Sequence, residues 1–187
     1  DATKAFSLTL RTRDEADGLP PALLAVTAQA ARDAGDARAT AETGPWRITL
    51  DHAVYAPFMM HSRNRAAREQ LCRASARRAA SGDLDNSPLI EQLLALRREM
   101  AALLGYASYA ELSLSSKTAR KVETVDALIA QLAGAARDAA QREADDLSAF
   151  ARAQGFDGAS LEPWDTAFWA ERQREHVYAY SDEELSR

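Results

Sequence analysis

The feature that most constrains the fold of this chain is an unbroken helical periodicity over residues 122–154, the longest such run in the sequence. Apolar side chains recur there every third or fourth residue, which places them on one narrow stripe of an α-helix. The stripe contains Val122, Val125, Leu128, Leu132, Ala136, Ala139 and Ala140, and it continues with Leu147, Phe150 and Ala151. At 1.5 Å per residue, about 33 residues give a helix roughly 50 Å long. A chain of 187 residues with such a helix is expected to be mainly α-helical.

More helices are predicted around this run, because Gly and Pro fall mainly between the segments rich in Ala and Leu. Their predicted ranges are 18–35, 52–62, 64–80, 88–105, 108–116 and 163–180. In 88–105 the residues at helical spacing are Leu89, Leu93, Leu96, Met100 and Leu103. Asp51 and Ser87 are expected to be N-caps, and Ser181 with Glu184 predicts the capping box of a further helix.

Two short segments alternate apolar and polar residues, as half-buried strands do. In residues 6–10 the apolar positions are Phe6, Leu8 and Leu10. In residues 46–50, Trp46, Ile48 and Leu50 are expected to share one face. We expect the two segments to pair into a small sheet. The predicted fold class is therefore mainly α, with a small strand pair near the N-terminal end.

Composition excludes several classes of partner. The net charge is -5 and the pI about 5.3, so nucleic acid is not expected, because phosphate binding needs a concentrated basic face. No segment has the roughly 18 apolar residues of a membrane span, and no membrane partner is expected. The single cysteine, Cys72, rules out an internal disulfide, suits a reducing compartment and is interpreted as a buried, inert thiol.

The residues alone predict neither a metal site nor a catalytic site. His52, His61 and His176 are the only histidines, and none lies four residues from another, as two zinc ligands on one helix do. The stretch "RQREH" at 172–176 differs by one residue from H-x-x-E-H, but it lacks the second imidazole. We interpret it as a charged helix face on which Glu171 and Glu175 repel each other.

Nucleophile and nucleotide motifs are also missing from the sequence. It contains no G-x-S-x-G elbow, P-loop or G-x-G-x-x-G, and the Ser and Asp residues of 81–87 are interpreted as loop and capping residues. Trp164 and Phe168, four residues apart on one helix, are expected in the core. The predicted catalytic and metal residues are therefore none, and the substrate-binding residues are unknown.

The order of the segments carries more information than any one motif. "WRITLD", "DNS", "LLALRREMAALLGY", "SYAELSL", "PWD" and "SDEEL" follow one another in a sequence that resembles the thimet oligopeptidase and oligopeptidase A family of zinc metallopeptidases. The resemblance runs from about Asp1 to Leu185. It implies a mostly helical, clam-shaped cytoplasmic enzyme that hydrolyses short peptides in a deep channel.

The resemblance also implies zinc, held in this family by H-E-x-x-H and a later Glu, with the motif Glu as general base. That motif is absent from these 187 residues, so zinc is expected in the parent enzyme and not on this chain. The chain is then expected to be one helical segment, 1–187, of a longer oligopeptidase, and to be inactive alone. The alternative is a stand-alone helical module for binding or scaffolding.

The start without Met and the unfinished helix at the last residues favour the fragment interpretation. In a fragment, surfaces that face the rest of the parent are expected to be apolar and exposed. The candidates are the helix 163–180 and the residues Phe58, Met59 and Met60. Self-association through these surfaces is a further expectation.

Overall fold

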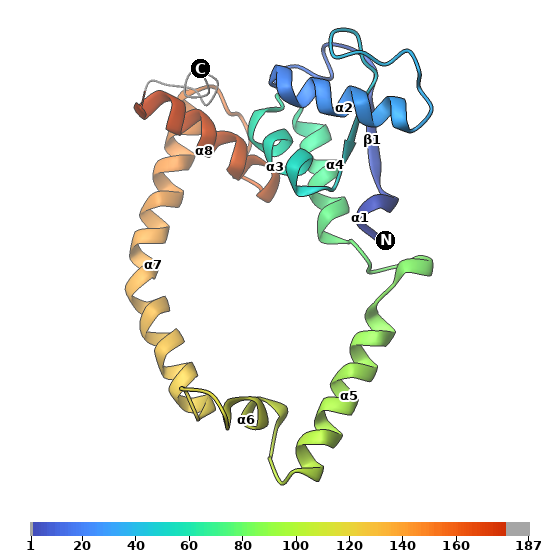
Figure 1. The fold of residues 1–187 in the computed structure, drawn as a ribbon. Helices are drawn as coiled ribbons and strands as arrows, with labels where there is room; N and C mark the ends of the chain where they lie inside the picture. The colour runs from blue at the N-terminus through green and yellow to red at the C-terminus, as the bar shows by residue number, and fades with distance from the viewer. Residues whose placement is uncertain (1, 179–187) are drawn as a thin grey trace. The chain divides into compact units, whose positions relative to one another are not determined.

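The computed structural model describes residues 2–178. Its helices are α1 (Ala2–Ala5), α2 (Pro21–Asp33), α3 (His52–His61), α4 (Arg65–Ala76), α5 (Ser87–Leu103), α6 (Tyr109–Leu114), α7 (Val122–Ala153) and α8 (Pro163–Tyr178) (Figure 1). The strands are β1 (Ser7–Leu10) and β2 (Trp46–Thr49), and η1 (Gly82–Leu84) is a short 3-10 turn. The prediction of a mainly α chain with one strand pair is confirmed. Every helix in residues 2–178 is too short or too polar to span a bilayer.

The chain divides into two compact units. Unit 1 consists of residues 1–78 with 147–187, and unit 2 consists of residues 79–146. Helix α7 begins in unit 2 and ends in unit 1.

The small sheet of unit 1 has the predicted partners. β1 and β2 pair antiparallel, with Leu8 opposite Ile48 and Leu10 opposite Trp46. Trp46 and Ile48 are completely buried, and the Trp46 indole N–H donates to the carbonyl of Ala41. Helix α2 packs on β2 and supplies further core residues.

The core of unit 1 corrects the prediction of an apolar exposed face at 163–180. Helix α8 packs against α3 and α4, which covers Trp164 and Phe168 and half-buries Trp169, whereas Tyr178 at the end of the helix is 64% exposed. Phe58 and Met59 of α3 are buried, as are Trp164 and Phe168 of α8, and Met60 is half-buried. The core positions of Trp164 and Phe168 are confirmed. The predicted exposed surface was wrong for Phe58, Met59 and the first turns of α8, because helices from distant parts of the chain meet there, whereas Val177 and Tyr178 are exposed.

Several helix ends differ from the predictions by a few residues. The helix predicted over 64–80 ends at Ala76, and its N-cap Asn64 accepts a hydrogen bond from the backbone N–H of Ala67. Ser87 is the first residue of α5, not its cap, and its backbone N–H donates to Asp85 Oδ1. The carboxylate of Asp85 therefore accepts from one of the backbone N–H groups that have no partner within the helix. Asp51 is the N-cap of α3 by position, without a side-chain capping bond. The predicted Ser181–Glu184 capping box lies outside the described residues.

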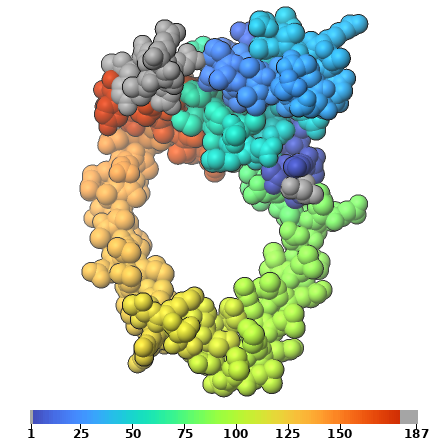
Figure 2. Space-filling model, viewed as in Figure 1, coloured from blue at the N-terminus to red at the C-terminus, as the bar shows by residue number. Residues whose placement is uncertain are grey.

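Unit 2 contains α5, α6 and the first part of α7. Helix α5, predicted over 88–105, ends at Leu103 and is followed by Gly105 with φ +80°, a conformation that favours glycine just after a helix. Ser108 caps α6 by accepting from the backbone N–H of Glu111. Helix α5 contacts α6, and the guanidinium of Arg97 lies over the ring of Tyr109. The apolar side chains of α5 are nonetheless largely exposed, and Figure 2 shows one side of this helix in green.

Candidate functional site

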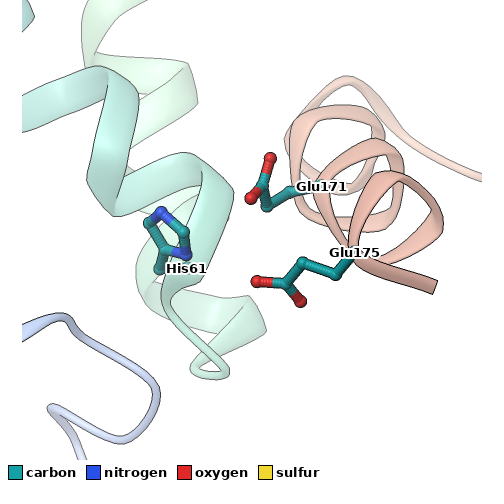
Figure 3. Close-up of side chains that lie close together, drawn as sticks. All are labelled: His61, Glu171 and Glu175. Atoms are coloured by element: carbon teal, nitrogen blue, oxygen red, sulfur yellow. The ribbon is translucent and has the colours of Figure 1, made fainter. Parts of the chain in front are cut away.

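A histidine and two glutamates meet where α3 lies against α8 in unit 1. His61 is the last residue of α3, and Glu171 and Glu175 are one turn apart on α8. Figure 3 shows the three side chains directed into the space between the helices. Their ligand atoms all lie within 4.8 Å of one another. Among residues 2–178, this is the group whose side chains have the donor types of a metal site.

Two arginines of α8 already occupy these donors. Arg172 Nε donates to Glu175 Oε2 at 2.9 Å, and its Nη2 lies 3.2 Å from His61 Nδ1. Arg174 binds both oxygens of Glu171, at 3.0 and 2.6 Å. A zinc ion needs three or four free donors at about 2.0–2.2 Å, and beside two guanidinium groups it is repelled. The residues therefore do not fit a zinc site in this arrangement.

The charged face predicted for "RQREH" is only partly solvated. Glu171 and Glu175 do share one face, but each is paired with an arginine three residues away, which removes the predicted repulsion. The Glu171 side chain is only 3% exposed, because this face lies against α3. No sequence spacing signals the approach of His61, which lies 110 positions before Glu171. His52 and His176 are exposed, and the His176 ring contacts Phe150.

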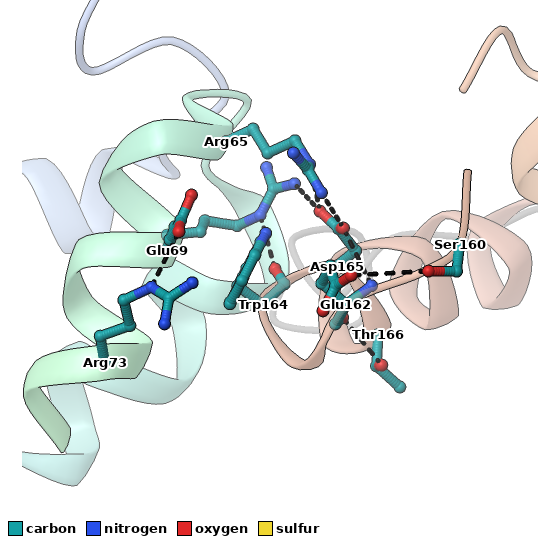
Figure 4. Close-up of polar contacts among 9 residues, drawn as sticks. Arg65, Glu69, Arg73, Ser160, Glu162, Trp164, Asp165 and Thr166 are labelled. Carbon is teal, nitrogen blue, oxygen red and sulfur yellow. Dashed lines mark hydrogen bonds and ion pairs between the residues drawn. The ribbon is translucent and has the colours of Figure 1, made fainter. Parts of the chain in front are cut away.

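A second polar network joins α4 to the start of α8 (Figure 4). Asp165 is completely buried and accepts from Arg65 through both carboxylate oxygens, at 2.9 and 2.7 Å. Arg68 Nη2 donates to Asp165 Oδ1 at 3.1 Å. The backbone N–H of Glu162, just before α8, donates to Asp165 Oδ2 at 3.2 Å. Asp165 thus caps its own helix and receives two guanidinium groups, in the position where the helix dipole favours a negative charge.

Arg68 is the buried cation of this network, with 3% of its side chain exposed. Its Nε donates to the carbonyl of Trp164 and its Nη1 to the carbonyl of Ser62, at 2.9 and 2.6 Å. Its guanidinium also lies 4.2 Å from the centre of the Phe168 ring. Arg68 therefore ties the residue that ends α3 to the first turn of α8, and the network fixes how three helices pack.

Burial and pairing with opposite charges shift the pKa values of these groups in opposite directions. Burial alone would raise the pKa of Asp165, but hydrogen bonds from Arg65, the Glu162 N–H and Arg68 outweigh it, so the pKa is lowered. Burial lowers the pKa of Arg68, and Asp165 partly offsets that shift. The hydrogen bonds from Arg174 lower the pKa of Glu171 despite its burial. The lowered pKa values keep the carboxylates of Asp165 and Glu171 ionised near neutral pH.

We expect Glu171→Gln to lower the free energy of unfolding of unit 1 by about 1.5–3 kcal/mol at pH 7, the range for hydrogen bonds to charged groups. The folded pKa of Glu171 lies below its unfolded value of about 4.3, so this stabilisation is present above that pH and is lost as the pH falls through the folded pKa. The difference between the variant and the wild type should therefore shrink below about pH 4. Urea unfolding followed by tryptophan fluorescence measures it in unit 1, which contains Trp46, Trp164 and Trp169.

The matched control is Glu69→Gln, which breaks the more exposed pair with Arg73 on α4. Its effect should be only about 0.3–0.5 kcal/mol, the value for helix surface pairs. Equal effects of the two substitutions would contradict a buried role for Glu171.

Comparison with known proteins extends the similarity over nearly the whole chain. The chain is 50% identical over 186 residues to the probable cytosolic oligopeptidase A of Arabidopsis thaliana, covering 99% of this chain and 26% of that protein. It is 49% identical to an organellar oligopeptidase A, chloroplastic/mitochondrial, of the same plant, covering 99% of this chain and 23% of that protein. Oligopeptidase A of Salmonella typhimurium is 38% identical over 190 residues, covering 99% and 27% respectively. The chain spans about a quarter of the length of these curated relatives.

The model of peptidase family M3 matches residues 58–187. This range contains both networks described above and all of unit 2. The resemblance to the thimet oligopeptidase and oligopeptidase A family is confirmed by these matches. The chain belongs to peptidase family M3.

Proposed function

We propose that residues 1–187 are one segment of a longer zinc-dependent oligopeptidase that hydrolyses short peptides. The observation that carries the proposal is the coverage of the relatives, which match 99% of this chain while the chain spans about a quarter of their length. The substrate class follows the names of these relatives. We propose a cytoplasmic location on the same ground, since one relative is named cytosolic, and an organelle is the alternative that a second name suggests.

The proposed role of the segment is structural. H-E-x-x-H is absent from the 187 residues, and the His61 cluster does not fit zinc, so no catalytic step is assigned to the described side chains. We propose that the segment supplies helical wall and hinge to a peptide channel. Helix α7 supports the wall role, because its 32 residues extend about 48 Å at 1.5 Å per residue. The buried Asp165 network supports it too, since its ion pairs and hydrogen bonds join α3, α4 and α8.

The alternative is a stand-alone helical module that binds or scaffolds a partner. The genomic reading frame distinguishes the two. We expect it to continue past residue 187 into an H-E-x-x-H motif, and a stop codon at that point would contradict the proposed oligopeptidase.

We expect the isolated 187-residue chain to hydrolyse no peptide, because it lacks the ligand set of the metal. The assay incubates the chain with a short quenched-fluorescent peptide and zinc, and it follows the increase of fluorescence. The protein from the full reading frame serves as the positive control and should show turnover that EDTA abolishes. EDTA-sensitive turnover by the isolated chain would refute the proposal that the metal ligands lie outside residues 1–187.

A further inference from the structure

Unit 2 exposes an unusual number of large apolar side chains on one helix. On α5 the exposed residues are Leu89, Ile90, Leu93, Leu94, Leu96, Met100 and Leu103, and Leu104 follows directly. Leu96 is 65% exposed and Leu103 is 87% exposed. On α7 of the same unit, Leu128, Ile129 and Leu132 are exposed to a similar degree. We call the exposed apolar residues of α5 the α5 face.

The α5 face is wider than the apolar stripe of an ordinary surface helix. Successive residues are rotated by about 100° around the helix axis. Viewed down that axis, the apolar arc runs from Leu103 at one edge to Leu94 at the other, which is roughly half of the helix circumference. Arg97 is the one charged residue within this arc, and its guanidinium lies over the ring of Tyr109. A helix with so broad an apolar side is typical of one buried between neighbours, whereas single exposed leucines need no explanation.

Part of the α5 face is shaped as a groove. Leu89, Leu93, Leu96 and Met100 line it together with Tyr109 of α6, and Gln92 and Arg97 add polar groups. Burying a leucine side chain fully is worth about 1.5–3 kcal/mol, so several such residues favour a covered state strongly. By contrast, large apolar residues of unit 1 such as Phe58 and Trp164 are buried in its core.

We propose that the α5 face packs against helices of the same longer polypeptide that lie outside residues 1–187. The inference rests on the proposed function. The relatives match this chain end to end and are about four times as long, so most of such a polypeptide is available to cover the face.

The test compares cysteine labelling in the isolated chain and in the protein from the full reading frame. Leu93→Cys is introduced in a Cys72→Ser background, and its reaction rate with a maleimide is measured. We expect fast labelling in the isolated chain and labelling at least about ten-fold slower in the longer protein, because a packed site reacts only after local opening. The control is Glu91→Cys, which points about 160° away from Leu93 on the same helix. Its rate should agree within about two-fold between the two proteins.

Three outcomes would overturn the proposal. Equal rates for Leu93→Cys in the two proteins mean that the longer polypeptide does not cover the face. Slow labelling in the isolated chain at every protein concentration means that its own unit 1 covers it. Protection in the isolated chain that increases with concentration, together with dimers in light scattering, means that a second copy covers it. Hydrogen exchange of the α5 amides in the unsubstituted proteins gives the same comparison if a variant fails to fold.

Failure of this proposal is separate from failure of the proposed function. A reading frame without H-E-x-x-H contradicts the function whatever the labelling rates are. Equal labelling rates in a longer protein that does contain the motif contradict only the packing of α5.

Discussion

Replacing Asp165 by Asn is expected to lower the free energy of unfolding of unit 1 by about 3–5 kcal/mol, the cost of removing one partner from a buried ion pair. The substitution preserves the shape of the side chain and removes its charge. Arg68 then remains buried, with 3% of its side chain exposed and no anion beside it. Arg65 also loses its two-bond contact, but it is half exposed and water compensates most of that loss. A change of this size is a large share of the stability of an ordinary domain.

Urea unfolding at pH 7 measures the effect, with tryptophan fluorescence as the probe because all three tryptophans lie in unit 1. The matched control is Asp157→Asn, the same substitution at an exposed position between α7 and α8. The control should change the unfolding free energy by less than about 0.5 kcal/mol. A loss below about 1 kcal/mol for Asp165→Asn would mean that the network does not hold α8 to α4.

Local sequence signals predicted the elements of this fold well. Proline at the first position of α8 and glycine after α5 mark helix ends through backbone geometry that depends on only a few neighbouring residues. The alternation around Leu8 and Ile48 likewise predicted both strands, and two short strands of one small domain have few other partners. These features need no knowledge of the tertiary structure, and they are confirmed.

The candidate site could not be predicted in the same way. Arg65 and Asp165 lie 100 positions apart, and His61 and Arg172 lie 111 apart. The helical spacing of residues in a sequence does not indicate which other helix will pack against them. The sequence therefore predicted Glu171 only as one residue of a charged helix face, although it is buried against α3. The assignment of this chain to an oligopeptidase family came from the order of its segments, because the 187 residues do not contain an H-E-x-x-H motif.

Phe58→Ala is expected to lower the free energy of unfolding of unit 1 by about 3–5 kcal/mol, the usual range for removing a buried aromatic side chain. Phe58 is completely buried in α3, and the helices packed around it limit collapse of the cavity. The same tryptophan fluorescence measurement applies. In the sequence, Phe58 was a candidate for an exposed surface, so this variant tests directly which apolar residues form the core.

The comparison variant is Leu96→Ala in the isolated chain, where this side chain is 65% exposed. Its effect on unit 2, followed by circular dichroism, should stay within about 0.5 kcal/mol, because little apolar surface is withdrawn from water there. In the longer protein the same substitution should become destabilising by about 2–5 kcal/mol if other helices cover the α5 face. Both residues are large, apolar and helical, and only the packing partner differs. A destabilised Leu96→Ala chain together with a neutral Phe58→Ala chain would reverse the assignment of core and interface.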